Sequence, residues 1–227
     1  KNFMTKVETK LAGQGRIGKL LYAVIRGILL LLCRLYFRLS VKGRENVPKT
    51  GAFILAPIHR SNVDTPISCA ATARRLRYMG KDSLFKIKPV GAVLAALGGF
   101  PVTRGTADLE ALKRCLEVLA LGEPIVMFPE GTRQFGETIQ PLFDGAAYLA
   151  IKANVPIVPV GIGGTQDVMP KGKKMIYPKK CTMIIGAPIY PPVKTTGRTP
   201  RTATTELTAK LKSELQELFD AAQIAAH

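Results

Sequence analysis

After residue 40, short apolar runs alternate with helix-like segments, and this alternation constrains the fold more than any other feature of the sequence. Each apolar run has the length of a buried strand and is too short for a core helix. The runs lie at 51–58, 124–128 and 156–162, and the helix-like segments lie at 66–79, 106–122 and 145–155. Strands and helices in this order predict an α/β fold, with a mainly parallel central sheet flanked by helices.

Three further elements complete the predicted domain. A strand at 100–103 follows a helix of small residues, a hairpin is predicted at 174–189, and a closing helix at 201–226 carries leucines at helical spacing. The sequence has no internal repeat and no low-complexity linker. We therefore expect one α/β domain over residues 41–227, preceded by an N-terminal helical appendage over residues 1–40.

Residues 17–39 form a long apolar segment that could in principle cross a bilayer. Arg26 and Arg34 argue against this, because each would cost about 2.5–3.5 kcal/mol at the centre of a membrane helix. On a helical projection the basic residues lie on one side and most leucines on the other, and no acidic residue occurs between Leu11 and Gly43. This pattern favours an amphipathic helix in the surface of an anionic membrane. The alternative is an amphipathic helix docked on the protein's own core.

The charge of the chain requires an anionic partner. Lysine and arginine number 33 against 16 aspartates and glutamates, which gives a net charge of +17. Nucleic acid, an anionic membrane surface and a phosphorylated small molecule all fit this charge. For nucleic acid we expect aromatic platforms or a binding motif, but aromatic residues make up only 7% and no such motif is found. We therefore expect no nucleic-acid partner.

Cysteines and histidines are too few and too scattered for a metal centre. The four cysteines, at positions 33, 69, 115 and 181, have no paired spacing and are predicted to be reduced packing residues. Only His59 lies inside the chain, since the other histidine is the last residue. A His/Cys centre would lack ligands, whereas an all-carboxylate magnesium site stays open but has no motif behind it.

The carboxyl ends of the strands are the expected place for a ligand. The residues after the predicted strands are His59 to Asp64, Arg104, Glu130 to Arg133, and Gly161 to Thr165. They supply a base, carboxylates, arginines and flexible glycines. The sequence therefore predicts the site at this edge of the sheet.

His59 and Asp64 can act together only if the backbone between them turns. On a helix, at about 100° per residue, five positions would separate the two side chains by about 140°. After a turn, the carboxylate could orient the imidazole so that His59 deprotonates a bound hydroxyl, which then attacks an activated carbonyl. The sequence has no G-x-S-x-G motif, so direct transfer fits better than a covalent intermediate. The alternative is that Asp64 only caps a helix and His59 is an ordinary loop residue.

The segment FPEGTR, which ends at Arg133, is suited to bind a phosphate. Gly131 lets a ligand approach the backbone, while Thr132 and Arg133 can donate hydrogen bonds, the arginine as a bidentate fork. Arg104 is a second candidate fork, and Lys81 is a third candidate cation. The alternative is a common strand-end turn with a solvated arginine.

Together these segments resemble the four sequence blocks of the glycerolipid acyltransferase superfamily, most closely those of bacterial 1-acylglycerol-3-phosphate (lysophosphatidic acid) O-acyltransferases. HRSNVD is similar to the H-x₄-D block, GGFPVTR to the second, FPEGTR to the third and VPIVPVGIGGT to the fourth, in order between Ile58 and Thr165. Family members commonly carry asparagine before the histidine, where this chain has Ile58. The departure leaves the His59 and Asp64 pair intact.

The resemblance implies a role for each of these residues. His59 would be the catalytic base and Asp64 its partner. The other implied residues bind or surround the phosphate of the acceptor: Arg104, Arg133, Glu130, Gly131 and Thr132.

The resemblance also implies the substrates and the location. A fatty acyl chain would pass from acyl-CoA or acyl carrier protein to the free hydroxyl of 1-acylglycerol-3-phosphate, giving phosphatidic acid in phospholipid biosynthesis. The enzyme would be peripheral or monotopic, on the cytoplasmic face of the cell membrane, and would need no metal or cofactor. Glycerol-3-phosphate or another lysophospholipid stays open as acceptor, and a thioesterase with the same base is a further alternative. The basic segment 171–180 could contact CoA or the membrane, or be a solvated loop.

Overall fold

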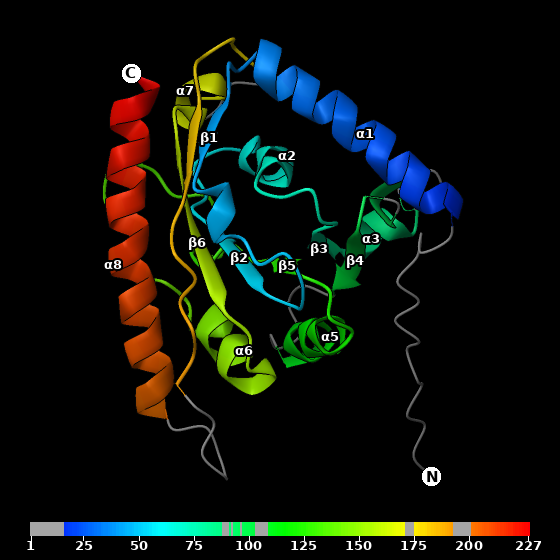
Figure 1. The fold of residues 1–227 in the computed structure, drawn as a ribbon, viewed down its shortest axis with the longest axis vertical. Coiled ribbons are helices and arrows are strands. Elements are labelled where there is room, and N and C mark those ends of the chain that lie inside the picture. Colours follow the sequence, from blue (N-terminus) through cyan, green and yellow to red (C-terminus); the bar gives the residue numbers. More distant parts are fainter. Residues whose placement is uncertain are drawn as a thin grey trace.

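The structure is a computed structural model that describes residues 16–87, 91, 93–95, 97–102, 109–170, 175–192 and 201–227. In this part of the chain a seven-stranded sheet is flanked by helices, which confirms the predicted α/β class (Figure 1). The strands are β1 (Ser40–Lys42), β2 (Ile54–Pro57), β3 (Arg77–Lys81), β4 (Gly99–Val102), β5 (Ile125–Val126), β6 (Ile157–Gly163) and β7 (Thr182–Ile185).

The sheet has the order β1-β7-β6-β2-β5-β3-β4. Strands β6, β2, β5, β3 and β4 run parallel to one another. β7 is antiparallel to β6 and parallel to β1. The two strands at the β1 edge of the sheet therefore run opposite to the other five. The parallel part therefore brings the residues after β2, β3 and β5 to one edge.

The helices are α1 (Arg16–Leu35), α2 (Asp64–Ile67), α3 (Asp82–Phe85), α5 (Leu109–Ala120), α6 (Gly145–Ala153), α7 (Thr165–Val168) and α8 (Arg201–Ala226), with short 3-10 turns η1 (Arg44–Asn46) and η2 (Ser68–Ala70). α8 lies along the sheet and packs against β6 and β7 (Figure 1). The approach is so close that a Cβ atom at Gly161 or Gly163 would collide with the α8 backbone.

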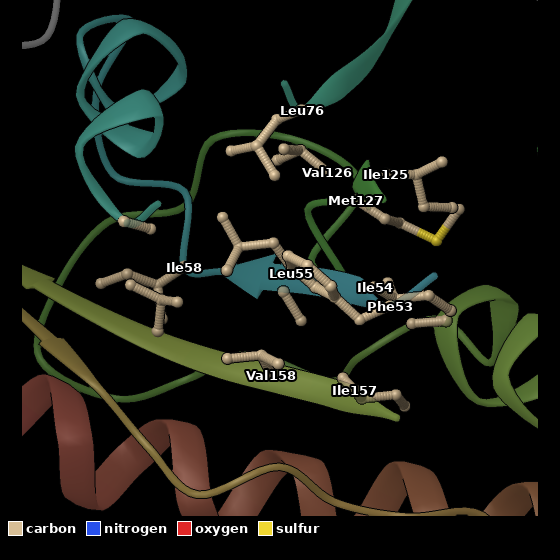
Figure 2. Close-up of a cluster of buried hydrophobic side chains, with 14 of the residues drawn as sticks. Phe53, Ile54, Leu55, Ile58, Leu76, Ile125, Val126, Met127, Ile157 and Val158 are labelled. Carbon is tan, nitrogen blue, oxygen red and sulfur yellow. The ribbon is translucent and has the colours of Figure 1, made fainter. Parts of the chain in front are cut away.

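The core centres on β2, which lies between β5 and β6. Every residue from Phe53 to Ile58 is buried, as expected for a strand with both faces covered. Figure 2 shows the β2 side chains between those of β5, such as Val126, and those of β6, such as Val158. This buried strand gives a rigid base to the loop that follows it.

The predicted helix at 66–79 is largely wrong. Helical structure ends at Ala70, and the chain forms β3 from Arg77 onward. Arg77 is buried, its backbone N–H donates to Pro124 O, and its guanidinium pairs with Glu123. Pairing with β4 and β5 thus overrides the local helical pattern.

The predicted hairpin at 174–189 is also wrong. Residues 175–181 form no strand, and β7 pairs with β6 and β1, which both lie outside the predicted hairpin. Pro178 lacks the backbone N–H that a ladder needs. The predicted closing helix is confirmed as α8, with Leu207, Leu211 and Leu215 buried.

α1 places its apolar side toward solvent. Tyr22 and Cys33 face the protein and are buried, whereas the leucines and other apolar residues of the opposite side are exposed: Leu20, Leu21, Val24, Ile28, Leu31, Leu32 and Leu35. Arg26, predicted to belong to the basic side, faces the protein instead and donates to Thr72 O at 2.7 Å. Within the described ranges, no helix is both long enough and apolar enough to span a bilayer.

Candidate active site

The site begins where β2 ends. Ile58 still donates its N–H to Val160 O on β6, and the chain then turns through residues 59–63 into α2. α2 begins at Asp64, and Pro66 lies in its first turn, where proline is tolerated. The predicted strand and turn are therefore present, and the helix that follows them is short.

The turn brings His59 and Asp64 together, side chain to side chain. His59 Nδ1 lies 3.2 Å from Asp64 Oδ2, and the backbone N–H groups of Arg60 and Ser61 each donate to the same oxygen at 2.6 Å. The Asp64 side chain is 0% exposed, whereas that of His59 is 17% exposed. With Nδ1 held by the carboxylate, Nε2 is the ring nitrogen left for a substrate.

Asp64 is more than a helix cap. Its Oδ2 atom binds groups that precede it in the chain, and its Oδ1 atom has no hydrogen-bond partner among the described residues. This arrangement excludes the interpretation in which Asp64 serves only the helix start. It fixes the orientation of the His59 ring, which is what a general base requires.

The segment after β5 holds His59 from the other side. The Phe128 ring stacks on the imidazole, with ring centroids 4.2 Å apart. Glu130 Oε2 accepts the His59 N–H at 2.9 Å, and the Gln134 N–H donates to His59 O at 2.8 Å. Both polar groups of the His59 backbone are thus bound by residues 130–134.

Arg60 completes this arrangement, and the sequence analysis did not single it out. Its guanidinium donates to Glu130 Oε1 at 2.7 Å and to Thr138 O at 3.3 Å, and it lies 4.9 Å from the centre of the Phe219 ring on α8. Arg60 and Glu130 are both almost fully buried. Nothing in the local sequence distinguishes such an arginine from a solvated one, because its partners are more than 60 positions away.

The phosphate-binding candidates differ in their placement. Gly131 has φ of 70° and sits against Phe143, where a Cβ atom would come within 2.6 Å of the ring. Thr132 and Arg133 are exposed, and Arg133 has no hydrogen bond or ion pair with any described residue. Lys81 is the last residue of β3, and its side chain lies outside the described part. Arg104 lies outside the described residues.

Comparison with known proteins gives the family. The model of the family described as Acyltransferase matches residues 38–163, which is more than half of the 227 residues. The chain belongs to the Acyltransferase family.

Relatives within this family carry a more specific name. A 1-acyl-sn-glycerol-3-phosphate acyltransferase of Bacillus subtilis is 30% identical over 152 residues, covering 66% of this chain and 73% of the relative. A chloroplast 1-acyl-sn-glycerol-3-phosphate acyltransferase of Brassica napus is 29% identical over 159 residues, covering 68% of this chain and 46% of the relative. The chain thus spans about half the length of the plant protein.

A solved structure has the same fold. The crystal structure of the 1-acyl-sn-glycerophosphate acyltransferase of Thermotoga maritima matches with a TM-score of 0.72 and 28% identity. The match covers 88% of this chain and 80% of that one. It therefore extends beyond the residues that the family model covers.

Next to the His59 and Asp64 pair, this member of the family has an apolar cavity of about 180 Å³. It lies between α1, α2, η2 and the β3–β4 edge, and it is lined by Tyr22, Arg26, Leu29, Thr65, Pro66, Cys69, Tyr78, Leu94, Leu97 and Gly99. Thr65 directly follows Asp64 in α2. The cavity therefore reaches the residue that follows the partner of His59 in the chain.

The cysteines are not poised for nucleophilic attack. All four are free and buried, as predicted. Burial raises the pKa of Cys69, the cysteine that lines the cavity, to about 11, so its thiol stays protonated near neutral pH. Burial also raises the pKa of Tyr78 far above its usual value. These groups serve as lining, which favours direct transfer over a thioester on the enzyme.

Proposed function

We propose that the protein is a 1-acylglycerol-3-phosphate O-acyltransferase that transfers a fatty acyl chain to the free hydroxyl of lysophosphatidic acid and produces phosphatidic acid. The observation that carries the proposal is the contact of His59 Nδ1 with the buried Asp64 carboxylate. An apolar cavity that Thr65 lines, and an exposed Arg133 with no hydrogen bond or ion pair to a described residue, support it. Membership of the Acyltransferase family and the names of the relatives support it.

The proposed reaction is a single transfer. His59 Nε2 takes the proton of the acceptor hydroxyl while the hydroxyl oxygen attacks the thioester carbonyl carbon. The new C–O bond forms, the C–S bond breaks, and the protonated imidazole returns the proton to the departing thiolate. Asp64 stabilises the imidazolium in between. It stays a prediction that no metal or other cofactor takes part.

The donor is proposed to be acyl-CoA, with acyl carrier protein as the alternative. Both present the acyl chain as a thioester, and the cavity beside Thr65 offers an apolar space for that chain. Labelled acyl-CoA and acyl carrier protein, each supplied with lysophosphatidic acid, would distinguish the donors. The proposal fails if the purified protein forms no phosphatidic acid with either donor.

The acceptor can be tested with a panel. Lysophosphatidic acid, glycerol-3-phosphate and a lysophospholipid with a larger head group should be assayed with the same donor. We expect the highest kcat/KM with lysophosphatidic acid. A preference for glycerol-3-phosphate would replace the proposed acceptor, and release of free fatty acid without ester formation would indicate a thioesterase.

Arg133→Ala should raise the KM for lysophosphatidic acid by about 10–100-fold, because a hydrogen bond to a charged group contributes about 1.5–3 kcal/mol. The kcat should change much less, since we assign Arg133 to the phosphate and not to the reacting atoms. Steady-state kinetics with varied acceptor measures both constants. Arg201→Ala is the matched control, because Arg201 is an exposed arginine at the start of α8. An unchanged KM for the R133A variant would contradict the assignment.

We also propose that α1 lies on the membrane, as a peripheral contact on the cytoplasmic face. Its exposed side is apolar, and Arg16, Lys19 and Arg34 are exposed on the same helix. Apolar residues flanked by basic ones suit the interface of an anionic membrane. Since α1 also contacts α2, this placement would bring the membrane close to the site.

The variant L20S/L31S/L35S should bind phosphatidylglycerol vesicles at least 10-fold more weakly. Each fully buried leucine contributes about 1.5–3 kcal/mol, and all three side chains are exposed in the free protein. Their exposure also predicts an unchanged melting temperature. Vesicle co-sedimentation measures the binding, and L121S/I224S, exposed apolar residues of other segments, is the control. Equal binding of both variants would contradict the placement of α1.

A further inference from the structure

A second exposed apolar segment lies outside α1. Residues 175–180, MIYPKK, follow α7 and precede β7. Met175, Ile176 and Tyr177 are 67%, 44% and 36% exposed, although each could bury a large apolar surface. Three consecutive exposed apolar side chains are unusual in a loop and often mark a contact with a partner or a membrane.

The position of this segment is fixed by hydrogen bonds on both of its sides. Tyr36, just after α1, donates its hydroxyl to Ile176 O at 2.8 Å. The Tyr177 N–H donates to Val168 O of α7 at 2.8 Å, and the Cys181 N–H donates to Phe37 O at 2.9 Å. Figure 1 shows this segment of the chain beside the C-terminal end of α1. The segment therefore lies next to the C-terminal end of α1, where Leu32 and Leu35 are exposed.

The charges around the segment suit an anionic lipid surface. Lys179 and Lys180 are exposed within it, and Arg34 and Arg38 are exposed at the adjoining end of α1. Asp167 is an acidic residue in this neighbourhood and shares a shallow hollow with Tyr177 and Lys179. The basic residues outnumber it, and each basic residue near an anionic membrane contributes about 1 kcal/mol.

We propose that residues 175–180 form a second membrane contact, in which Met175, Ile176 and Tyr177 enter the lipid interface and Lys179 and Lys180 bind anionic head groups. The proposal rests on the proposed membrane association of α1. It extends that association, because two contacts define how the protein is oriented on the surface, whereas one helix permits rotation about its axis.

Both contacts would adjoin the candidate active site. α1 contacts α2 and η2, which follow His59. Asn62 Nδ2, in the loop after His59, lies 3.6 Å from Met169 Sδ, at the end of α7 that leads toward the segment. Fixing both contacts would hold the loop that carries His59 near the head-group layer, where the phosphate of a lysophospholipid lies.

The chain has no tryptophan, so a single introduced indole reports on its own position. Three variants are compared on phosphatidylglycerol vesicles: I176W in the segment, L31W on α1, and L121W just after α5. Figure 1 shows α5 at the other end of the molecule from the C-terminal end of α1. For I176W and L31W we expect a blue shift of the emission and quenching by lipids with brominated acyl chains. For L121W we expect neither.

The outcomes separate this inference from the proposal on α1. A response of L31W without a response of I176W overturns the second contact and leaves the α1 contact standing. If neither variant responds, both proposals fail. A blue shift of I176W that depends on protein concentration and occurs without vesicles would mean that a second copy of the chain covers the segment, which also overturns it.

A binding measurement supports the fluorescence. M175S/I176S should weaken partitioning into phosphatidylglycerol vesicles by roughly 10-fold or more, from the lost apolar burial. K179Q/K180Q should weaken it at low salt and have little effect at high salt. Thermal unfolding of each variant checks that the fold is intact. Unchanged partitioning of M175S/I176S, with the fold retained, would overturn the inference.

Discussion

His59→Ala should lower kcat for acyl transfer by about 10²–10⁴-fold, the range expected when a positioned general base is removed. The structure supports this because the His59 ring is the partly exposed member of the pair and Asp64 holds its Nδ1. The KM for lysophosphatidic acid should change little, since the phosphate is assigned to Arg133. Steady-state kinetics with varied acceptor separates the two constants.

Asp64→Asn tests the same pair from the buried side. Asp64 Oδ2 accepts the Arg60 and Ser61 N–H groups as well as facing His59 Nδ1, so an amide would disturb the orientation of the ring. We expect a large fall in kcat, and thermal unfolding must show that the variant folds. Near-normal turnover by folded H59A or D64N protein would remove the base from the mechanism.

The sequence patterns predicted correctly those strands and helices that depend mainly on neighbouring residues in the chain. The apolar run that became β2 is buried on both faces, and the leucine spacing of α8 matches its contact with β6. The helix predicted at 66–79 was largely wrong because β3 forms through pairing with β4 and β5, which come later in the sequence. Its arginines resemble a solvated helix face, yet Arg77 is buried against Glu123.

In the candidate site, too, some features were predictable from the local sequence and others depend on the tertiary fold. The turn between His59 and Asp64 followed from their spacing together with the strand before them and Pro66 after them. The partnership of Arg60 with Glu130 and Phe219 depends on the tertiary fold and leaves no local signal. Glu130 was expected to shape the phosphate pocket, but both of its carboxylate oxygens are bound within the protein, to the His59 N–H and to Arg60.

Arg60→Met should destabilise the protein by about 3–5 kcal/mol, because it leaves the Glu130 carboxylate buried without a counter-charge. Urea unfolding measures this change. The double variant R60M/E130Q should be more stable than R60M, since glutamine removes the unpaired charge and its carbonyl can still accept the His59 N–H. If the losses of R60M and E130Q simply add in the double variant, the two side chains are not coupled.

The kinetics of these variants distinguish positioning from substrate contact. Because Glu130 is buried and both of its carboxylate oxygens are bound within the protein, E130Q and R60M should lower kcat through a displaced His59 and leave the KM for lysophosphatidic acid nearly unchanged. A raised KM with normal kcat would mean instead that Glu130 touches the acceptor. The matched control is the pair Arg77 and Glu123, which lies on the β3 side of the fold.

R77M/E123Q removes another arginine–glutamate pair, so it should lower stability without a specific loss of kcat at temperatures where it is folded. The comparison matters because loss of stability alone can reduce activity. A fall in kcat that occurs in R60M/E130Q and is absent from R77M/E123Q, with both proteins folded, would show that the Arg60 pair acts on His59. In that case α8, through Phe219 beneath Arg60, helps to hold the base in place.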